Sequence, residues 1–430
     1  MSVLHVLCDC ARRLSENQLQ SASLLNLGVR RVLNDSQCVE AILSCIKQVF
    51  ETEQYADKAI EAGLANQAFW NQATKAYYVQ HCYELIRYHR QLNTALDIDI
   101  SDENWPWLHF EAYQLLNGVE LPNWSEFAGL EVEALKANLN EASPAEQQSY
   151  PDWLWQRAEQ ELGNDWVNIA QALNVPAKPY LRVNTLKTDA ETLQTSLKKS
   201  QSITKVLEQE NCLEVEEYGY LFKSEAFSKG WFEMQDAGSQ QIAPLLDVKP
   251  GQRVVDACAG AGGKSLHLAN LMQNKGYILS MDIHQHKLDA LKKRAKRAGV
   301  HMLETRFIKN SKTIKRLKEK FDRVLLDVPC SGTGVLRRNP DAKWHLQPEN
   351  IDTLISLQAE ILLRYSQMCK VGGKLVYATC SIFPSENQQQ VQAFLENNPN
   401  FELLEELNLQ PGINSEYDGF YAAVLTKKAV

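Results

Sequence analysis

The chain has 430 residues, of which 44% are apolar and 23% are charged, and its net charge is −8. This length exceeds one ordinary hydrophobic core, so two or three domains of a soluble globular protein are expected. No apolar run is long enough to cross a bilayer, so the sequence predicts no membrane-spanning helix.

The N-terminal stretch MSVLHVLCDCARRL places its arginines after its apolar residues, which is the wrong order for a signal peptide. The ten cysteines are scattered and form no Cys-x-x-Cys pair. Neither a metal site nor a disulfide framework is therefore predicted. Reduced thiols in a cytoplasmic protein are expected instead.

The charge is unevenly distributed along the chain. Residues 1–140 carry 10 basic and 18 acidic side chains, whereas residues 275–343 carry 18 basic and 7 acidic ones. The basic run KKRAKR at 292–297, together with Arg337, Arg338 and Lys343, is predicted to contact nucleic-acid phosphates. The alternative is a solvated helix face, which is the commoner explanation of a charged run.

The first 140 residues predict a helical accessory domain, because their apolar positions recur at three- and four-residue spacing. The polar, proline-containing stretch at 140–151 is predicted to be a linker. Residues 141–232 then hold a helical stretch and the strand-like segment PYLRVNTLKTD. They predict a small α/β subdomain.

Residues 233–430 alternate between apolar strands and helices. The strand-like segments are RVVDACA, GYILSMD, FDRVLLDV and GKLVYAT, and helical segments such as GGKSLHLANLM and HKLDALKKRAKRA lie between them. Apolar strands joined by helical crossovers predict a doubly wound parallel sheet covered on both faces. Such a sheet binds its ligand at the carboxyl ends of the strands.

Three glycines follow the first of these strands, in the segment DACAGAGGKS at 256–265, and they allow a ligand to approach the backbone closely. A phosphate-binding P-loop would need glycine at 258, where cysteine stands. The dinucleotide fingerprint would need glycine at 265, where serine stands. Both alternatives fail, so the segment favours a loop that holds S-adenosylmethionine.

Asp282 stands at the end of the next predicted strand, twenty residues beyond Gly262. A carboxylate in this place can bind the ribose hydroxyls of a nucleoside cofactor. The alternative is that Asp282 caps the following helix. The glycine loop and Asp282 together favour a nucleoside-type cofactor.

Two cysteines each close a predicted parallel strand, in the segments DVPC (327–330) and ATCS (378–381). Both thiols should therefore face the cofactor crevice, although a single cysteine near a strand end is usually just a small buried residue. Such a pair suits methylation of a pyrimidine carbon. A thiolate that adds to C6 makes C5 nucleophilic, and a second group must then help the C5 proton and the thiol to leave.

At this point the chain resembles the RNA cytosine-5 methyltransferases of the RsmB (Sun/Fmu) type. The likeness covers about residues 150 to 430. It is carried by RVNTLK (182–187), QDAGSQ (235–240), VVDACAGAGGK (254–264), LLDVPCSGTGVLRRNPDAKW (325–344), LVYATCSIFPSEN (375–387) and YDGFYAAVLTKK (417–428).

This resemblance implies a class I S-adenosylmethionine-dependent methyltransferase domain with a seven-stranded sheet over residues 233–430. It also implies that Cys380 is the nucleophile, that Cys330 assists product release, and that Asp327 lies against cofactor and base. The residues expected to hold S-adenosyl-L-methionine are Cys258, Ala259, Gly260, Ala261, Gly262, Gly263, Lys264, Asp282 and Asp327. An RNA-binding role for residues 141–232 and a NusB-like fold for residues 1–140 are expected by the same resemblance.

The sequence departs from the family pattern at two places. Gly260 and Ala261 stand where the family usually has Ala-Pro, so the loop is expected to bind the cofactor while being less rigid. After the third strand, Lys309 and Asn310 stand where the family has an acidic residue near the adenine. That contact is therefore not predicted for this chain.

The preferred hypothesis is a monomeric RNA cytosine-5 methyltransferase that acts on small-subunit (16S) ribosomal RNA. A transfer-RNA cytosine-5 methyltransferase and a non-catalytic RNA-binding or ribosome-assembly protein on the same fold are the alternatives. The presence of Asp327, Cys330 and Cys380 together argues against the non-catalytic alternative, because a scaffold needs none of them.

Overall fold

The computed structural model describes residues 35–98, 103–217 and 219–429. The stretch that was compared with a signal peptide lies outside the described residues, as do Cys8 and Cys10. The chain divides into two compact units. The helical unit runs to Glu159 and also includes Arg338–His345, and the α/β unit comprises Gln160–Arg337 and Leu346–Val430.

The described part of the helical unit confirms the predicted helical N-terminal region. Its helices are α3 (Ser36–Glu51), α4 (Ala56–Asn66), α5 (Gln72–Arg87), α6 (His89–Leu96), α7 (Trp105–Leu116), α8 (Val132–Glu141), α9 (Pro144–Gln147), the start of α10 (Asp152–Leu162) and α18 (Ala342–His345). Helix α3 shows why they form. The Asp35 side chain caps it by accepting from the Cys38 N–H, and Val39, Ile42 and Ile46 bury one face at helical spacing.

The polar stretch at 140–151, predicted to be a linker, is instead an ordered part of the helical unit. Ser143 and Glu146 form a reciprocal capping box at the start of α9. The side chain of Tyr150 is fully buried, and its carbonyl accepts from the Arg90 guanidinium at 2.6 Å. Local composition suggested a linker here, but these long-range contacts hold the segment within the helical unit.

Residues 338–345 are integrated into the helical unit although they follow a strand of the other unit in sequence. The Trp344 indole donates to the Ile86 carbonyl at 2.8 Å, and the Ala56 N–H donates to the Asp341 carboxylate at 3.0 Å. Lys343 is 1% exposed, with its ammonium 4.4 Å from the Tyr150 ring centre. The prediction that Lys343 contacts phosphates is therefore wrong.

The α/β unit contains a small antiparallel sheet with strand order β2-β3-β1-β4. Its elements are α11 (Trp166–Leu173), β1 (Tyr180–Val183), α12 (Ala190–Lys198), β2 (Ile203–Val206), β3 (Cys212–Glu217), α13 (Glu225–Ser228) and β4 (Phe232–Met234). Strand β1 is buried along its whole length because it lies between β3 and β4.

The second sheet of this unit has seven strands in the order β10-β11-β9-β8-β5-β6-β7. Strand β11 is antiparallel to both its neighbours, and the other pairs are parallel. The elements are α14 (Ala237–Leu245), β5 (Arg253–Asp256), α15 (Gly263–Leu271), β6 (Tyr277–Asp282), α16 (Gln285–Ala298), β7 (Leu303–Phe307), α17 (Ser311–Lys315), β8 (Phe321–Asp327), α19 (Pro348–Tyr365), β9 (Cys369–Thr379), α20 (Gln388–Asn397), β10 (Phe401–Leu409) and β11 (Phe420–Lys427). The predicted seven-stranded sheet is confirmed.

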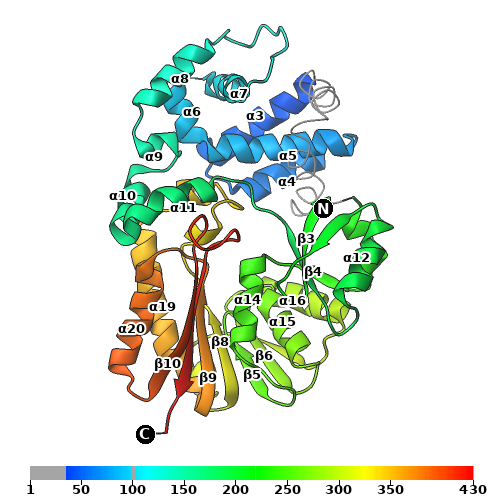
Figure 1. Ribbon diagram of the computed structural model, residues 1–430, viewed down its shortest axis with the longest axis vertical. Coiled ribbons are helices and arrows are strands. Elements are labelled where there is room, and N and C mark those ends of the chain that lie inside the picture. Colours follow the sequence, from blue (N-terminus) through cyan, green and yellow to red (C-terminus); the bar gives the residue numbers. More distant parts are fainter. Residues whose placement is uncertain (1–34, 99–102, 218, 430) are drawn as a thin grey trace. The chain divides into compact units, whose positions relative to one another are not determined.

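Helices cover both faces of this sheet, as Figure 1 shows. Alternate strand residues enter opposite cores: Val254 packs with α14, α15 and α16, whereas Val255 packs with α17, α19 and α20. The carboxyl-terminal parts of the central strands β5, β6, β8 and β9 therefore bury both of their faces, which explains their nearly continuous apolar sequence. Because β5, β6, β8 and β9 are parallel, their carboxyl ends meet at one edge of the sheet.

Candidate active site

The glycine loop leaves the carboxyl end of β5 and enters α15. Gly262 has a φ of +87° and precedes the helix, and an added Cβ there would lie 1.9 Å from the Leu291 side chain. Glycine is therefore required at this position by both conformation and space. At Gly260 and Gly263, by contrast, an added Cβ would meet no atom within 4 Å. The loop therefore leaves open space beside its backbone.

Asp282 ends β6 and binds the glycine loop directly. One carboxylate oxygen accepts from the Gly260 N–H at 2.8 Å and the other from the His284 N–H at 2.7 Å. The residue at the N-cap of α16 is His284, so Asp282 is not the cap of this helix. It joins the ends of two neighbouring strands, and each of its oxygens retains further capacity to accept.

Asp256, at the end of β5, is a buried carboxyl that no sequence motif singled out. It is 1% exposed and accepts from the Ser265 hydroxyl at 2.6 Å, while its Oδ1 has no hydrogen-bond partner. Burial raises the pKa of Asp256 to about 7, since desolvation outweighs the hydrogen bond from Ser265. An acidic residue inside an apolar strand segment was the signal that could have identified it.

Lys264 and Asp327 meet across the same edge of the sheet. The lysine ammonium lies 2.7 Å from the Asp327 carboxylate and 5.5 Å from the centre of the Phe420 ring. Burial is the largest single influence and acts to lower the pKa of Lys264, but the charge and hydrogen bond of Asp327, together with the nearby Cys380 and Asp256, outweigh it, so the net shift is upward. Two predicted site residues from different strand ends therefore form one charged pair.

The two predicted thiols lie together at the ends of the neighbouring strands β8 and β9. The Sγ atoms of Cys330 and Cys380 are 3.3 Å apart, and the Cys380 N–H lies 3.3 Å from the Cys330 sulfur. The contact with Cys380 and then burial raise the pKa of the Cys330 thiol, so it favours the protonated form. If the two cysteines were only small buried residues, their sulfur atoms would have no need to lie this close together.

Backbone contacts hold the segment that carries Cys380. Its carbonyl accepts from the Gly334 N–H at 2.9 Å, and the Gly334 carbonyl accepts from the Gly419 N–H at 2.8 Å. An added Cβ on Gly334 would lie 2.4 Å from the Gly419 oxygen. The glycines of the SGTG and YDGF segments are therefore needed so that these backbones can touch.

The basic run at 292–297 is only partly available to RNA. Arg294 and Arg297 of α16 pair with the buried Glu233 of β4 at 2.9 and 2.6 Å, and Arg294 also donates to the Ala261 carbonyl at 2.8 Å. These arginines connect the small sheet to α16 and the glycine loop. The exposed members of the run are Lys292, Lys293 and Lys296.

Arg337 has a similar structural role. It is 8% exposed and donates to the Asp418 carboxylate at 2.6 Å and to the Glu416 carbonyl at 2.8 Å. The prediction that Arg337 contacts phosphates is therefore wrong. Its partner lies beside Gly419, so this ion pair supports the Cys380 segment.

The RVNTLK segment also proves to be a connection between the two sheets. The Asn184 side chain donates to the carbonyls of Gly230 at 2.7 Å and Ala298 at 2.9 Å, and it accepts from Asn270 at 2.7 Å. Arg182 is 2% exposed and donates to the Gly263 carbonyl at 2.7 Å. This segment therefore fixes the small sheet against α15 and α16.

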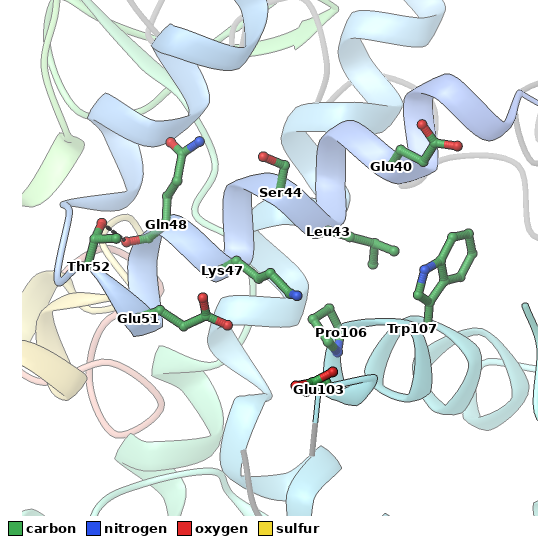
Figure 2. Close-up of a pocket in the computed structure, with 10 residues that line it drawn as sticks. All are labelled: Glu40, Leu43, Ser44, Lys47, Gln48, Glu51, Thr52, Glu103, Pro106 and Trp107. Carbon is green, nitrogen blue, oxygen red and sulfur yellow. Dashed lines mark hydrogen bonds between the residues drawn. The ribbon is translucent and has the colours of Figure 1, made fainter. Parts of the chain in front are cut away.

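A hollow in the helical unit lies between α3 and α7, where Figure 2 shows Lys47, Glu51, Glu103 and Trp107 at its wall. It contains none of the predicted site residues. In the described ranges, no group of three or more His, Cys, Asp or Glu side chains is placed to hold a metal ion. No helix there is long and apolar enough to cross a membrane.

Comparison with known families matches two parts of the chain. A family described as "16S rRNA methyltransferase RsmB/F" matches residues 243–426, and a "Methyltr_RsmF/B-like, ferredoxin-like domain" matches residues 150–217. "Ribosomal RNA small subunit methyltransferase B" of Yersinia pseudotuberculosis is 33% identical over 321 residues, which is 73% of each chain. The chain belongs to the RsmB/F methyltransferase family.

Other RsmB/F relatives match over a shorter length. "Probable ribosomal RNA small subunit methyltransferase B" of Bacillus subtilis is 36% identical over 261 residues, which cover 60% of this chain and 58% of the relative. The match therefore spans less than two thirds of that relative's length.

Solved structures agree on the fold. The crystal structure of PH0851 has a TM-score of 0.76, with 24% identity, and covers 91% of this chain and 98% of its own. A methyltransferase homologue from Pyrococcus horikoshii has a TM-score of 0.59, with 29% identity, and covers 66% and 98%. The α/β unit thus has the class I methyltransferase fold.

Both departures from the RsmB/F pattern have local partners in the structure. The Gly260 N–H is held by Asp282, and the Ala261 carbonyl is held by Arg294. Asn310, at the position of the expected acid, caps α17 by accepting from the Lys312 N–H at 3.0 Å. The residue that replaces the expected acid after β7 is therefore the N-cap of α17.

Proposed function

We propose that the α/β unit transfers a methyl group from S-adenosyl-L-methionine to C5 of a cytosine in RNA, with small-subunit ribosomal RNA as its substrate. The observation that carries this proposal is the 3.3 Å separation of the Cys330 and Cys380 sulfurs beside the glycine loop. Membership of the RsmB/F family supports ribosomal RNA as the substrate class. We also propose that the enzyme is monomeric and cytoplasmic.

The residues of the loop fit the proposed cofactor. Open space beside Gly260 and Gly263 would admit its methionine part close to the backbone. The Asp282 carboxylate would accept from the ribose hydroxyls while it keeps its bond to the Gly260 N–H. The sulfonium cofactor would supply an electrophilic methyl group.

The two thiols would divide the covalent chemistry. The Cys380 thiolate would form a bond to C6 of cytosine, which places negative charge on the ring and makes C5 nucleophilic. After C5 has taken the methyl group, removal of its proton restores the C5–C6 double bond and breaks the sulfur–C6 bond. Cys330, beside Cys380, is the proposed participant in this elimination.

Asp327 and Lys264 would stabilise the charge on the ring. The lysine ammonium, held by the Asp327 carboxylate, can donate to the cytosine N3 or O2 region, where negative charge develops after addition to C6. The 2.7 Å pair between them places both groups at the strand edge that carries Cys330. Replacement of Asp327 by asparagine would weaken this contribution without removing either thiol.

Covalent trapping on a denaturing gel tests the division between the thiols. Cys330→Ala is expected to accumulate protein joined to RNA, because the adduct forms but is released slowly. Cys380→Ala and the double variant are expected to form no adduct and to methylate no cytosine. The control is binding of S-adenosylmethionine, which all three variants should retain.

The outcome of the trapping experiment also separates the alternatives. A shifted band from Cys380→Ala, with none from Cys330→Ala, would reverse the two roles. In another outcome, the wild-type protein binds RNA while bisulfite sequencing finds the same methylated cytosines in ribosomal and transfer RNA with and without the protein. That result would support the non-catalytic alternative. Modified cytosines confined to transfer RNA would replace the proposed substrate.

A further inference from the structure

Glu386 is a fully buried carboxylate that none of the proposed catalytic steps uses. It lies in the short 3₁₀ turn Pro384–Glu386, six residues after Cys380, and is 0% exposed. A buried carboxylate is costly unless hydrogen bonds replace its water. The hydrogen-bond donors around Glu386 therefore indicate which segments of the chain the carboxylate holds.

Four hydrogen bonds reach the two oxygens of Glu386. Oε1 accepts from the Ser331 N–H at 2.8 Å and from the Gln358 side chain of α19 at 2.9 Å. Oε2 accepts from the hydroxyls of Ser331 and Ser381, each at 2.5 Å. The carboxylate is thus satisfied by donors from three separate segments.

Three of these four donors belong to the two residues that directly follow the cysteines. Ser331 follows Cys330, and Ser381 follows Cys380, so one carboxylate holds both of the chain segments that carry the thiols. The hydroxyl of Thr333 reinforces the same contact, at 3.0 Å from the Ser331 hydroxyl and 3.2 Å from that of Ser381. Removing the carboxylate would loosen both segments together.

We propose that Glu386 is a positioning residue, which holds the two sulfur atoms at the separation that cytosine methylation requires. This inference rests on the proposed function, because it concerns the same pair of thiols. The physical reason is that misplacing a reacting group by an ångström costs a large factor in rate. A single rigid acceptor shared by both segments limits such movement.

The electrostatics of the pair agree with this role. The contact with Cys380 and burial are the larger causes of the raised pKa of Cys330, and the negative charge of Glu386 adds to them. The carboxylate therefore helps to keep Cys330 protonated beside Cys380. Glu386→Gln should lower the pKa of Cys330, which can be followed by its alkylation with iodoacetamide across pH.

The structure offers a control carboxylate that contacts the same turn from α10. Glu161 accepts from the Ser385 N–H at 3.0 Å and from the Ser385 hydroxyl at 2.9 Å. These bonds hold the residue before Glu386, not the serines that follow the cysteines. Glu161→Gln therefore removes a half-buried carboxylate that contacts the turn and leaves the proposed contacts in place.

The test measures the thiol separation without RNA. Diamide is added to the full-length protein, and mass spectrometry follows the rate at which the Cys330 and Cys380 peptides become joined by a disulfide. Because a lower pKa of Cys330 would by itself speed the reaction, the rates are compared at equal ionisation of Cys330, taken from the alkylation profile. Under that condition Glu386→Gln is expected to slow this bridge severalfold, whereas Glu161→Gln should match the wild type. Ser381→Ala, which removes one of the four bonds, should act in the same direction with a smaller effect and serves if Glu386→Gln does not fold.

Steady-state kinetics complete the test. Glu386→Gln is expected to lower kcat by roughly tenfold to a hundredfold, with KM for RNA within about twofold of the wild type. Unchanged bridge formation in Glu386→Gln would overturn the positioning role, even if kcat fell. Slow bridge formation in this variant together with no methylation by the wild type would support the positioning role and refute the proposed function.

Discussion

Three buried histidines of the helical unit and two buried carboxylates of the α/β unit are accommodated in opposite ways. In the helical unit, His81, His89 and His109 are buried, and desolvation lowers the pKa of each, to about 4 for His81 and about 3 for His89. In the α/β unit, the carboxylates of Asp282 and Glu386 accept hydrogen bonds from backbone N–H groups and hydroxyls. The first set is buried uncharged, and the second is buried with its charge satisfied.

The difference shows what each buried group contributes. His89 stacks on Phe50 with ring centres 3.7 Å apart, so it fills the helical core as an aromatic side chain. Glu386 instead connects residues that are far apart in sequence and carry the proposed chemistry. A buried neutral group serves packing, whereas a buried and fully bonded carboxylate fixes the geometry of loops.

The largest expected effect is loss of stability in the helical unit at acid pH. The folded-state pKa of its histidines lies below the unfolded value of about 6.5, so their contribution to stability is present above that pH and is lost as pH falls toward 3. His81 and His89 should each contribute roughly 1 kcal/mol per pH unit between pH 6 and 5. Hydrogen exchange of α5 and α7 amides, corrected for intrinsic rates, measures this loss.

His89→Phe keeps an aromatic ring but removes one proton-binding site, so it should reduce that slope. An unchanged slope would show that His89 is not among the groups responsible.

Asp256 should make the stability of the α/β unit change with pH in the opposite direction. Its pKa is raised from 3.8 to about 7 by desolvation, so its contribution is present below pH 4 and is lost as pH rises through 7. Asp256→Asn should remove this loss from β5 and leave α5 unaffected.

A second prediction concerns a carboxylate that organises a loop and also faces the proposed cofactor. Asp282→Ala removes an acceptor of the ribose hydroxyls, and a hydrogen bond to a charged group contributes roughly 1.5–3 kcal/mol. Affinity for S-adenosylmethionine, measured by calorimetry, should therefore fall by about tenfold or more. Unchanged affinity would limit Asp282 to holding the Gly260 N–H. Glu386→Gln is the comparison variant, since it should leave cofactor binding unchanged.

The smallest effects are expected at the surface of α16. Lys293 and Lys296 are exposed, whereas Arg297 pairs with the buried Glu233. Replacing either lysine by glutamine should reduce the salt dependence of RNA binding by about one unit or slightly less per lost phosphate contact. Arg297→Gln should instead lower the stability of the α/β unit. A wild-type salt slope near zero would assign these lysines to a solvated face.

Much of the site could be predicted from local pattern. Alternating apolar strands and helices indicated the doubly wound sheet, and Asp282, Cys330 and Cys380 each stood at or just after the end of a predicted strand. Because parallel strands bring their carboxyl ends to one edge, these positions were expected to converge. The structure brings the thiols together and places the glycine loop against Asp282, while the catalytic and cofactor-binding roles remain proposals.

Where the prediction failed, the deciding contacts join distant parts of the chain. Composition suggested that 140–151 was a linker and that Arg337 and Lys343 met phosphates, yet partners far away in sequence bury Tyr150, Arg337 and Lys343. Composition and periodicity indicate which residues favour a strand, a helix or solvent, but they do not indicate which distant residues come into contact.

The sequence by itself therefore determined the order of strands and helices and the strand-end positions of the predicted site residues. Only the tertiary structure decided that Glu386 reaches Ser331, 55 residues away, and Ser381 at once. The physical reason is that this contact depends on β8 and β9 lying side by side, and strand neighbours are set by packing of the whole sheet.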